Sequence, residues 1–280
     1  MKINARTILC ASLAYPNRTA KSPIMQNAGF EALDLNYIYM AFEPEKKYLK
    51  NAIDGIRGLG LKGVSISKPY KEEVIQYLDG LDKIAQDIGA VNTILNSENK
   101  LIGYNSDWIG AIKAIEEKIS IKNKKVVVVG AGGAGKAVAY GMKYCGGQVF
   151  IYNRSLEKAS KLASLLKVDL GGDLGELQKM KDYDILVNAT SVGSYPDTNR
   201  SIIPENILIE GKIIMDVVIN PWHTFLIKKA QQMNCQTITG LKMLLFQGAF
   251  QFKLFTGYEA PIKVMERSLV QTLVKGEEKE

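Results

Sequence analysis

The sequence offers little of the chemistry on which many active sites depend. Its only histidine, His223, lies in the segment NPWHTF, whose proline and tryptophan favour an exposed loop. A Ser-His-Asp triad would have to use this one histidine. A metal site built from several histidines is excluded. We therefore expect proton transfer to rely on lysine, tyrosine or aspartate, and we expect no metal centre.

Cysteines and long apolar runs are also scarce. Cys10, Cys145 and Cys235 lie far apart and form no Cys-x-x-Cys pair, which argues against a disulfide framework or a thiolate metal site. A reducing cytoplasm fits this pattern, so we expect a cytoplasmic protein. No apolar run approaches the roughly 20 residues that cross a membrane, and the first one is interrupted by Ser12. We expect no membrane partner.

Basic residues exceed acidic ones, 36 to 29, and the formal net charge is +7. Such a surplus attracts anionic small molecules, although a soluble basic surface explains it equally well. Nucleic acid is the rival partner, but the lysines are scattered and no arginine-rich block alternates with aromatic residues. We expect a small-molecule substrate and no nucleic-acid partner.

Predicted strands and helices alternate in the first part of the chain. Strands are predicted at 7–13, 35–42 and 62–67, and helices at 22–34, 47–60 and 69–79. This order predicts an α/β fold with a mostly parallel sheet. Two more strands are expected within 90–107, around the turn SEN, followed by a helix at 108–120.

A second α/β part begins at residue 124, where a run of four valines leads into a glycine-rich turn. Later strands are predicted at 183–190, 212–218 and 235–240. We predict two domains, residues 1–105 and 106–240, of which the second is a Rossmann domain. The apolar C-terminal helix, about 241–280, is expected to pack back on the first domain.

The turn in VVVVGAGGAG, residues 126–135, has the spacing G-x-G-x-x-G. Gly130 permits a sharp turn, Gly132 lets a pyrophosphate approach the backbone, and Gly135 permits close helix–strand packing. A tight turn without a ligand is the alternative. We predict a dinucleotide site whose first contacts come from Gly130, Ala131, Gly132, Gly133 and Ala134.

The second strand of this unit indicates which dinucleotide binds. NAD-binding proteins usually place an acidic residue at its end, on the ribose 2′-hydroxyl. Here the strand ends in IYNRS, with no acid before Glu157. Arg154 is suited to a 2′-phosphate, and Asn153 and Ser155 add hydrogen bonds. We therefore predict NADP rather than NAD.

A nicotinamide cofactor implies hydride transfer between a carbonyl and an alcohol, whose oxygen needs a proton partner. Polar residues follow several predicted strands, at the sheet edge where α/β proteins bind ligands. They are Ser65, Ser67, Lys71, Asn92, Thr93, Asn105, Ser106 and Asp107. A lysine beside a carboxylate can donate a proton to a developing alkoxide. Alone, however, SISKPYKE does not distinguish a catalytic Lys71 from a surface lysine.

Seven segments together resemble the shikimate dehydrogenase family. In the family's order and approximate spacing, over residues 7–257, they are GVSISKPYKEEV, IGAVNTI, GYNSDWIG, GAGGAGKA, YNRS, NATSVG and TGLKMLLFQGAFQF. The resemblance implies an N-terminal substrate domain, an NADP-binding Rossmann domain and an active site in the cleft between them. It also implies reversible, NADP-dependent reduction of 3-dehydroshikimate to shikimate, a step of chorismate and aromatic amino acid biosynthesis.

The resemblance assigns roles to individual residues. The family's catalytic lysine, two positions after a proline, corresponds to Lys71, and its carboxylate partner corresponds to Asp107. Lys68 precedes that proline, where the family usually has an apolar residue. The implied substrate-binding residues are Ser22, Ser67, Asn92, Asp107 and Gln247. Further implied cofactor contacts are Thr190, Val217, Gly240 and Met243.

The sequence also departs from the family's pattern. Two serines, after a histidine, usually hold the substrate carboxylate; here Ser22 remains, but Ala20 replaces the first serine and Thr19 the histidine. Thr19 or Lys21 would have to compensate. Ile219 stands where a tyrosine is usual. Each lost hydrogen bond to a charged group costs about 1.5–3 kcal/mol, so the substrate can differ from shikimate, as in the shikimate dehydrogenase-like branch.

Other functions remain open at this stage. A quinate or quinate/shikimate dehydrogenase predicts activity with quinate and with NAD, and Arg154 argues against NAD. An NADP-binding sensor without turnover is the non-enzymatic alternative; the presence of Lys71, Asn92 and Asp107 counts against it. The sequence is compatible with a monomer or a homodimer.

Overall fold

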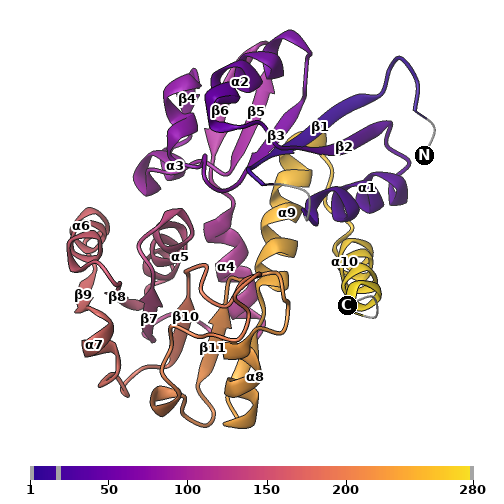
Figure 1. The fold of residues 1–280 in the computed structure, drawn as a ribbon. Coiled ribbons are helices and arrows are strands. Elements are labelled where there is room, and N and C mark those ends of the chain that lie inside the picture. Colours follow the sequence, from indigo (N-terminus) through magenta and orange to yellow (C-terminus); the bar gives the residue numbers. More distant parts are fainter. Residues whose placement is uncertain (1–2, 17–19, 278–280) are drawn as a thin grey trace. The chain divides into compact units, whose positions relative to one another are not determined.

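The computed structural model describes residues 3–16 and 20–277. The chain divides into two compact units, each with its own sheet (Figure 1). One unit combines the chain up to Ser106 with the chain from Leu245 onward, and the other is Asp107–Leu244. Among the described helices, none is long and apolar enough to cross a membrane.

The sheet of the first unit has the strand order β2-β1-β3-β5-β6-β4. Its strands are β1 (Ile8–Leu13), β2 (Tyr37–Phe42), β3 (Gly63–Ile66), β4 (Gly80–Leu81), β5 (Thr93–Ser97) and β6 (Lys100–Tyr104). β1 pairs in parallel with β2 and β3, and β4 with β6. β5 is antiparallel to both β3 and β6, and Glu98 and Asn99, at positive φ, close the tight hairpin between β5 and β6. The expected α/β class is confirmed.

The helices expected at 22–34 and 47–60 are present with similar bounds, whereas the short helix at 83–88 was not expected. The helices of the first unit are α1 (Ser22–Ala32), 3₁₀ helix η1 (Lys46–Tyr48), α2 (Leu49–Gly58), 3₁₀ helix η2 (Glu73–Tyr77), α3 (Lys83–Ile88) and α10 (Ile262–Glu277). Lys21, not Ser22, is the N-cap of α1. The helix expected at 69–79 is only η2, because the Lys71 carbonyl accepts a hydrogen bond from the Val91 amide, 2.7 Å away, instead of one from the next turn.

The single C-terminal helix expected over about 241–280 is in fact two helices. α9 (Gly240–Thr256) ends before Gly257, which has φ +80°, and α10 begins after Pro261. A glycine at positive φ followed by a proline stops a helix for steric reasons. α10 packs against α1, within the first unit.

The second unit has a wholly parallel sheet in the order β9-β8-β7-β10-β11-β12. Its strands are β7 (Lys125–Val129), β8 (Gln148–Tyr152), β9 (Asp169–Gly172), β10 (Ile185–Asn188), β11 (Ile213–Asp216) and β12 (Gln236–Ile238). Its helices are α4 (Asp107–Glu116), α5 (Gly133–Tyr144), α6 (Leu156–Leu166), α7 (Leu174–Leu177), α8 (Phe225–Gln232) and the 3₁₀ helix η3 (Glu205–Ile207). This is the doubly wound dinucleotide-binding order, with the switch point between β7 and β10.

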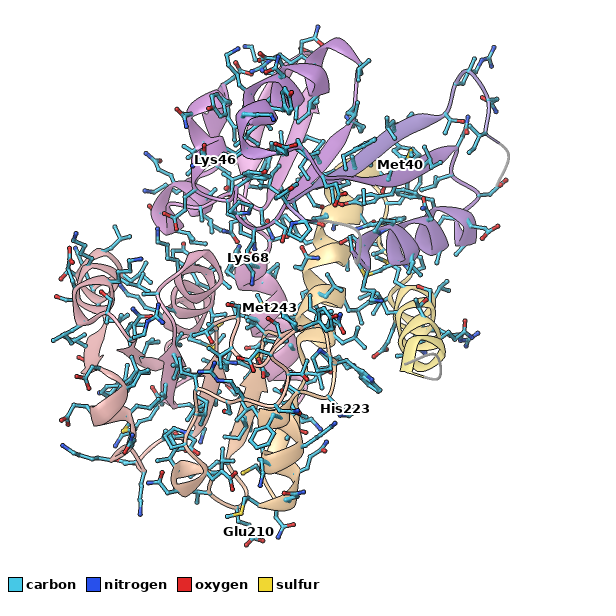
Figure 2. The ribbon with its side chains drawn as sticks, in the orientation of Figure 1. Met40, Lys46, Lys68, Glu210, His223 and Met243 are labelled. Carbon is cyan, nitrogen blue, oxygen red and sulfur yellow. The ribbon has the colours of Figure 1, made fainter. Side chains whose placement is uncertain are left out.

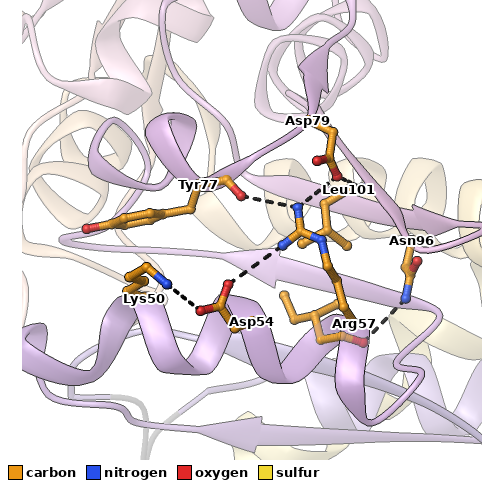
Figure 3. Close-up of polar contacts among 8 residues, drawn as sticks. Lys50, Asp54, Arg57, Tyr77, Asp79, Asn96 and Leu101 are labelled. Atoms are coloured by element: carbon orange, nitrogen blue, oxygen red, sulfur yellow. Dashed lines mark hydrogen bonds and ion pairs between the residues drawn. The ribbon is translucent and has the colours of Figure 1, made fainter.

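Arg57 joins three segments of the first unit (Figure 3). From α2 its Nη2 donates to Asp79 Oδ2 at 2.7 Å and to the Tyr77 carbonyl at 3.5 Å. Asp79 Oδ2 also accepts the Leu101 amide at 2.6 Å, at the start of β6. The Leu101 amide and then Arg57 lower the pKa of Asp79 below its ordinary 3.8. The carboxylate form of Asp79 is therefore the form that the fold prefers.

Asp79→Asn should remove a pH-dependent contribution to stability. Because the folded-state pKa is lowered, the wild type should be more stable than the variant above pH 3.8, and this advantage should vanish as the pH falls through the lowered pKa. Urea unfolding of both proteins between pH 7 and pH 3 measures the difference. Asp54→Asn, which removes a weaker partner 3.9 Å from Arg57, is the control. A constant difference at every pH would contradict the prediction.

Two glycines should respond in opposite directions to the same substitution. A Cβ on Gly63, in β3, would lie 2.1 Å from Cδ1 of the buried Phe255. A Cβ on Gly55, within α2, would meet no atom within 4 Å. Gly63→Ala should destabilise the fold by about 1–3 kcal/mol through overpacking, whereas Gly55→Ala should stabilise it by about 0.5–1 kcal/mol. Denaturant unfolding checks both signs.

Candidate functional site

The glycine-rich turn of the second unit connects β7 to α5. Gly130 has φ +121°, and its amide donates to the Tyr152 carbonyl at the end of β8, 2.8 Å away. A Cβ on Gly135 would lie 2.1 Å from the Gly130 carbonyl oxygen, so packing alone requires glycine there. A Cβ on Gly132, in contrast, would meet no atom within 4 Å. Packing does not require Gly132, and the missing Cβ leaves the backbone open to close approach by a ligand.

The N-terminus of α5 suits an anion. Gly132 is its N-cap, and the first turn, which contains Gly133 and Ala134, has no acidic residue. The unpaired amides and the helix dipole place partial positive charge there. Ala131 lies in the same turn and is half-buried. The predicted phosphate-binding residues therefore adjoin one another at the carboxyl end of β7.

In the turn after β8, two of the three predicted residues form bonds within the turn and the third is exposed. Asn153 donates through Nδ2 to the Ser155 carbonyl at 3.0 Å, and Ser155 caps α6 through the Lys158 amide. These bonds shape the turn, while the Arg154 side chain between them is exposed. Glu157, the nearest acid, pairs with Lys161 at 2.5 Å. The turn therefore presents a guanidinium, which suits a phosphate better than a hydroxyl group.

Two further loops of the second unit lie at the carboxyl ends of β10 and β11. Thr190 follows β10, and its amide and hydroxyl both donate to Asn188 Oδ1. Val217 follows β11, and a Cβ on Gly240 would lie 2.7 Å from the Val217 carbonyl oxygen. Met243 is nearly buried on α9, one turn after Gly240 (Figure 2).

A continuous chain of buried polar side chains runs through the first unit. Its members lie within β2 and β3, at or next to the ends of β5 and β6, or in α9, and consecutive members are hydrogen-bonded. In order they are Tyr39, Ser65, Gln251, Thr93, Asn92, Ser106 and Gln247. Such a network is stable in a protein interior because each buried group finds a partner.

Backbone groups determine the direction of these hydrogen bonds. The Ser106 amide can only donate, so the Asn92 atom 2.7 Å from it is Oδ1. Thr93 Oγ1, also 2.7 Å from that oxygen, must then donate to it. Asn92 consequently directs Nδ2 toward Ser106 Oγ at 2.9 Å and Gln247 Oε1 at 3.4 Å. Gln247 therefore directs Oε1 toward Asn92 and Ser106. Its Nε2, which can only donate, points the other way.

Gln251 and Tyr39 extend this order to the other end of the chain. The Asn92 carbonyl can only accept, so the Gln251 atom 3.4 Å away is Nε2, and Oε1 accepts from Ser65 at 2.9 Å. Tyr39 then donates to Ser65 Oγ at 2.6 Å. Burial raises the pKa of Tyr39, while hydrogen bonds with Ser65, Ser12 and Ser22 act in the opposite direction. The phenol stays protonated as a donor.

Sequence reasoning did not assign a role to Tyr39 or Gln251. Gln251 stands four residues after Gln247 in α9, on the same helix face, and this spacing was a usable signal. Tyr39 carried no such signal, because only the pairing of β2 with β1, and of β1 with β3, brings it to Ser65.

Lys71 lies in the turn between β3 and η2 and is half-buried. Its carbonyl accepts from Val91, the neighbour of Asn92, so the two predicted residues adjoin in the first unit. Lys68 (Figure 2) is exposed; its pKa is lowered by desolvation and by the charge of Lys71. Ser67 is exposed beside it, and Ser22 opens α1. Asp107, the first residue of α4, is buried in the second unit.

His223 differs from its expectation. It is half-buried rather than exposed, with its ring centroid 3.9 Å from that of Trp222 (Figure 2). Contact with the adjacent indole, at an interplanar angle of 60°, removes part of the imidazole from water.

Three family descriptions match successive parts of the chain. "Shikimate dehydrogenase substrate binding domain" matches residues 13–94, "Shikimate / quinate 5-dehydrogenase" matches 113–217, and "Shikimate 5'-dehydrogenase C-terminal domain" matches 240–270. The first coincides with the sheet that holds the polar chain. The second contains the glycine-rich turn.

Characterised relatives are similar over nearly their whole length. A shikimate dehydrogenase (NADP⁺) of Methanocaldococcus jannaschii is 42% identical over 98% of this chain and 100% of its own. One from Pyrococcus furiosus is 43% identical over 95% and 96%. The structure of shikimate 5-dehydrogenase from Thermus thermophilus, in complex with NADP(H) and shikimate, is 33% identical with a TM-score of 0.89, over 95% of this chain and 100% of its own.

Structures with other activities share the fold. A 5-ketofructose reductase of Gluconobacter is 30% identical, with a TM-score of 0.85 over 96% of this chain and all of its own. A quinate dehydrogenase of Corynebacterium glutamicum, in complex with NAD, is 28% identical with a TM-score of 0.87 over 95% and 99%. The higher identities, the three matching descriptions and the order of the motifs agree with one another, and the chain belongs to the shikimate dehydrogenase family.

Proposed function

We propose that this protein catalyses the NADP-dependent, reversible reduction of 3-dehydroshikimate to shikimate. The observation that carries the proposal is the ordered polar chain from Tyr39 to Gln247, which ends in amide and hydroxyl groups suited to a polyhydroxylated ring. Family membership and the cofactor turn of the second unit support it.

Lys71 is the proposed proton donor. NADPH, when bound, would supply the hydride to the carbonyl carbon. The Lys71 ammonium gives a proton to the oxygen as it becomes an alkoxide, and takes the proton back in the reverse direction. Asp107 is its proposed carboxylate partner and orients the same hydroxyl. We do not assign this role to Lys68, which is exposed and stands where the family usually has an apolar residue.

Four other residues bind the substrate in this proposal. Asn92 and Gln247, whose carboxamides are oriented by the polar chain, bind ring hydroxyls together with Ser67. Ser22 binds the carboxylate. Because Gln247 already has a defined orientation, it does not have to reorganise when the substrate arrives, which lowers the cost of binding.

The cofactor is held by the second unit. We assign the pyrophosphate to the turn Gly130–Ala134 and the 2′-phosphate to Asn153, Arg154 and Ser155. The nicotinamide half is assigned to Thr190, Val217, Gly240 and Met243. The amide-rich N-terminus of α5 and the exposed guanidinium support this assignment.

A related hydroxy acid, such as quinate, is the second candidate substrate. Ala20 and Ile219, both described and half-buried, have no side-chain hydrogen-bonding group. Thr19 and Lys21 are the residues expected to compensate for Ala20, and Thr19 lies outside the described residues. Without these hydrogen-bonding groups the site discriminates less strongly between shikimate and related hydroxy acids.

We also place the protein in the cytoplasm, as a monomer or homodimer. Cys10, Cys145 and Cys235 are all free thiols, and burial raises the pKa of the Cys10 thiol to about 12. Thiols in this state are typical of a reducing compartment.

Lys71→Ala should lower kcat by roughly 10²–10⁴, because proton transfer from a positioned group contributes about that much. The dissociation constant for NADP should stay within a factor of two or so of the wild type. NADP reduction, followed by nicotinamide absorbance with shikimate and quinate in parallel, measures the rate. Lys68→Ala is the matched control and should keep most of the activity. Equal losses in the two variants would argue against Lys71 as donor.

Arg154→Ala should weaken NADP binding by roughly 10- to 100-fold, the usual value of a charge-assisted hydrogen bond lost from a phosphate. Binding of NAD should not change, because NAD has no 2′-phosphate. Titration calorimetry with both cofactors gives the two constants. Lys158→Ala removes an exposed cation from the next turn and should leave both unchanged. A parallel loss of NAD affinity would contradict the assignment of Arg154.

A further inference from the structure

Asp216 is a fully buried carboxylate to which the proposed reaction assigns no role. It ends β11, and its side chain accepts three hydrogen bonds. Asn188 Nδ2 and the Val218 amide donate to Oδ1, each at 3.0 Å, and Thr224 Oγ1 donates to Oδ2 at 2.7 Å. Burial raises the pKa of Asp216 to about 6, against the effect of these bonds. At neutral pH the group is therefore ionised and accepts from all three donors.

Asp216 and the Thr190 amide together require one orientation of the Asn188 carboxamide. A carboxylate can only accept, so Asn188 must turn Nδ2 toward it and Oδ1 away. Oδ1 then accepts from the Thr190 amide at 3.0 Å and from the Thr190 hydroxyl at 2.7 Å. Thr190 Oγ1 in turn accepts from the Val192 amide at 3.1 Å. The loop that follows β10 is thus held by a chain of bonds that begins at Asp216.

This loop packs directly against the glycine-rich turn. A Cβ on Gly130 would lie 2.9 Å from the Ala189 carbonyl oxygen and 3.0 Å from Thr190 Cγ2. β7 and β10 are neighbours at the switch point of the sheet, where dinucleotides bind (Figure 1). A shift of the loop after β10 would therefore disturb the turn that holds the pyrophosphate.

The same carboxylate also holds the loop that follows β11. Its bond to the Val218 amide fixes residues 217 and 218. A Cβ on Gly240 would lie 2.4 Å from the Val218 carbonyl oxygen, so the start of α9 rests on this loop. Both loops at the carboxyl edge of β10 and β11 depend on one buried group.

We propose that Asp216 is a positioning residue for NADP: it orders the loops 189–192 and 217–218 into the geometry that binds the nicotinamide half of the cofactor. The inference rests on the proposed function, because it takes NADP as the ligand of this edge. Asp216 acts only through Asn188, Val218 and Thr224 and does not touch the cofactor itself.

The test compares Asp216→Asn and Asp216→Ala with the wild type. Asparagine keeps an oxygen for Asn188 and Val218 and alters only the contact with Thr224, whereas alanine removes all three. We expect the dissociation constant for NADP, from titration calorimetry, to rise roughly threefold for asparagine and roughly tenfold or more for alanine. The KM for NADP should rise in step, while the KM for shikimate and the kcat at saturation should stay within about twofold.

Asp184→Asn is the matched control. Asp184 precedes β10 at the opposite edge of the same sheet and accepts from the Lys125 amide at 3.0 Å. This variant should bind NADP like the wild type. If Asp216→Ala does not fold, the graded change in Asp216→Asn still tests the idea, read against its melting temperature.

Two results would overturn the inference. One is unchanged NADP affinity in a folded Asp216 variant; the other is a parallel fall in NADP affinity, shikimate affinity and melting temperature, which marks a purely structural role. If the wild-type protein itself fails to bind NADP, the proposed function fails as well, and this result is distinct from the other two.

Discussion

Buried polar groups must find hydrogen-bond partners inside the protein, and this constraint shapes the functional end of each sheet. An unpaired buried donor or acceptor costs about 1–3 kcal/mol. In the first unit the requirement is met by a chain of neutral side chains, from Tyr39 to Gln247. In the second unit it is met by a single carboxylate, Asp216, with three donors around it.

The two solutions share a physical principle. Groups that can only donate or only accept, such as the Ser106 amide and the Asp216 carboxylate, remove the ambiguity of neighbouring carboxamides. Asn92 and Asn188 therefore each have one orientation. A side chain with one orientation presents a defined donor or acceptor to a ligand and loses little entropy on binding.

The proposed proton donor, Lys71, lies in a segment that does not form a regular helix. Lys71 is next to the polar chain through the bond between its carbonyl and Val91, and that same bond prevents the segment 69–79 from forming a regular helix. The local departure from helical structure thus coincides with the proposed proton donor. Strained or irregular backbone at functional positions is a recurrent feature of enzymes.

The sequence by itself determined the α/β class, the glycine-rich turn and the kind of cofactor that suits Arg154. These features are local: they follow from periodicity, from the steric freedom of glycine and from residues adjacent in the chain. The positions of Lys71, Asn92 and Asp107 were inferred from motifs, but the roles proposed for them still await experiment.

Only the tertiary structure decided the rest. Tyr39 and Asp216 became functional candidates because strand pairing brings them to distant partners; Tyr39 and Ser65, for example, are 26 residues apart. The helix expected at 69–79 was lost to a bond with Val91, and the expected C-terminal helix was divided at Gly257. Long-range hydrogen bonds of this kind leave no periodic signal in the sequence, because they depend on where separate elements meet and not on the order of residues within them.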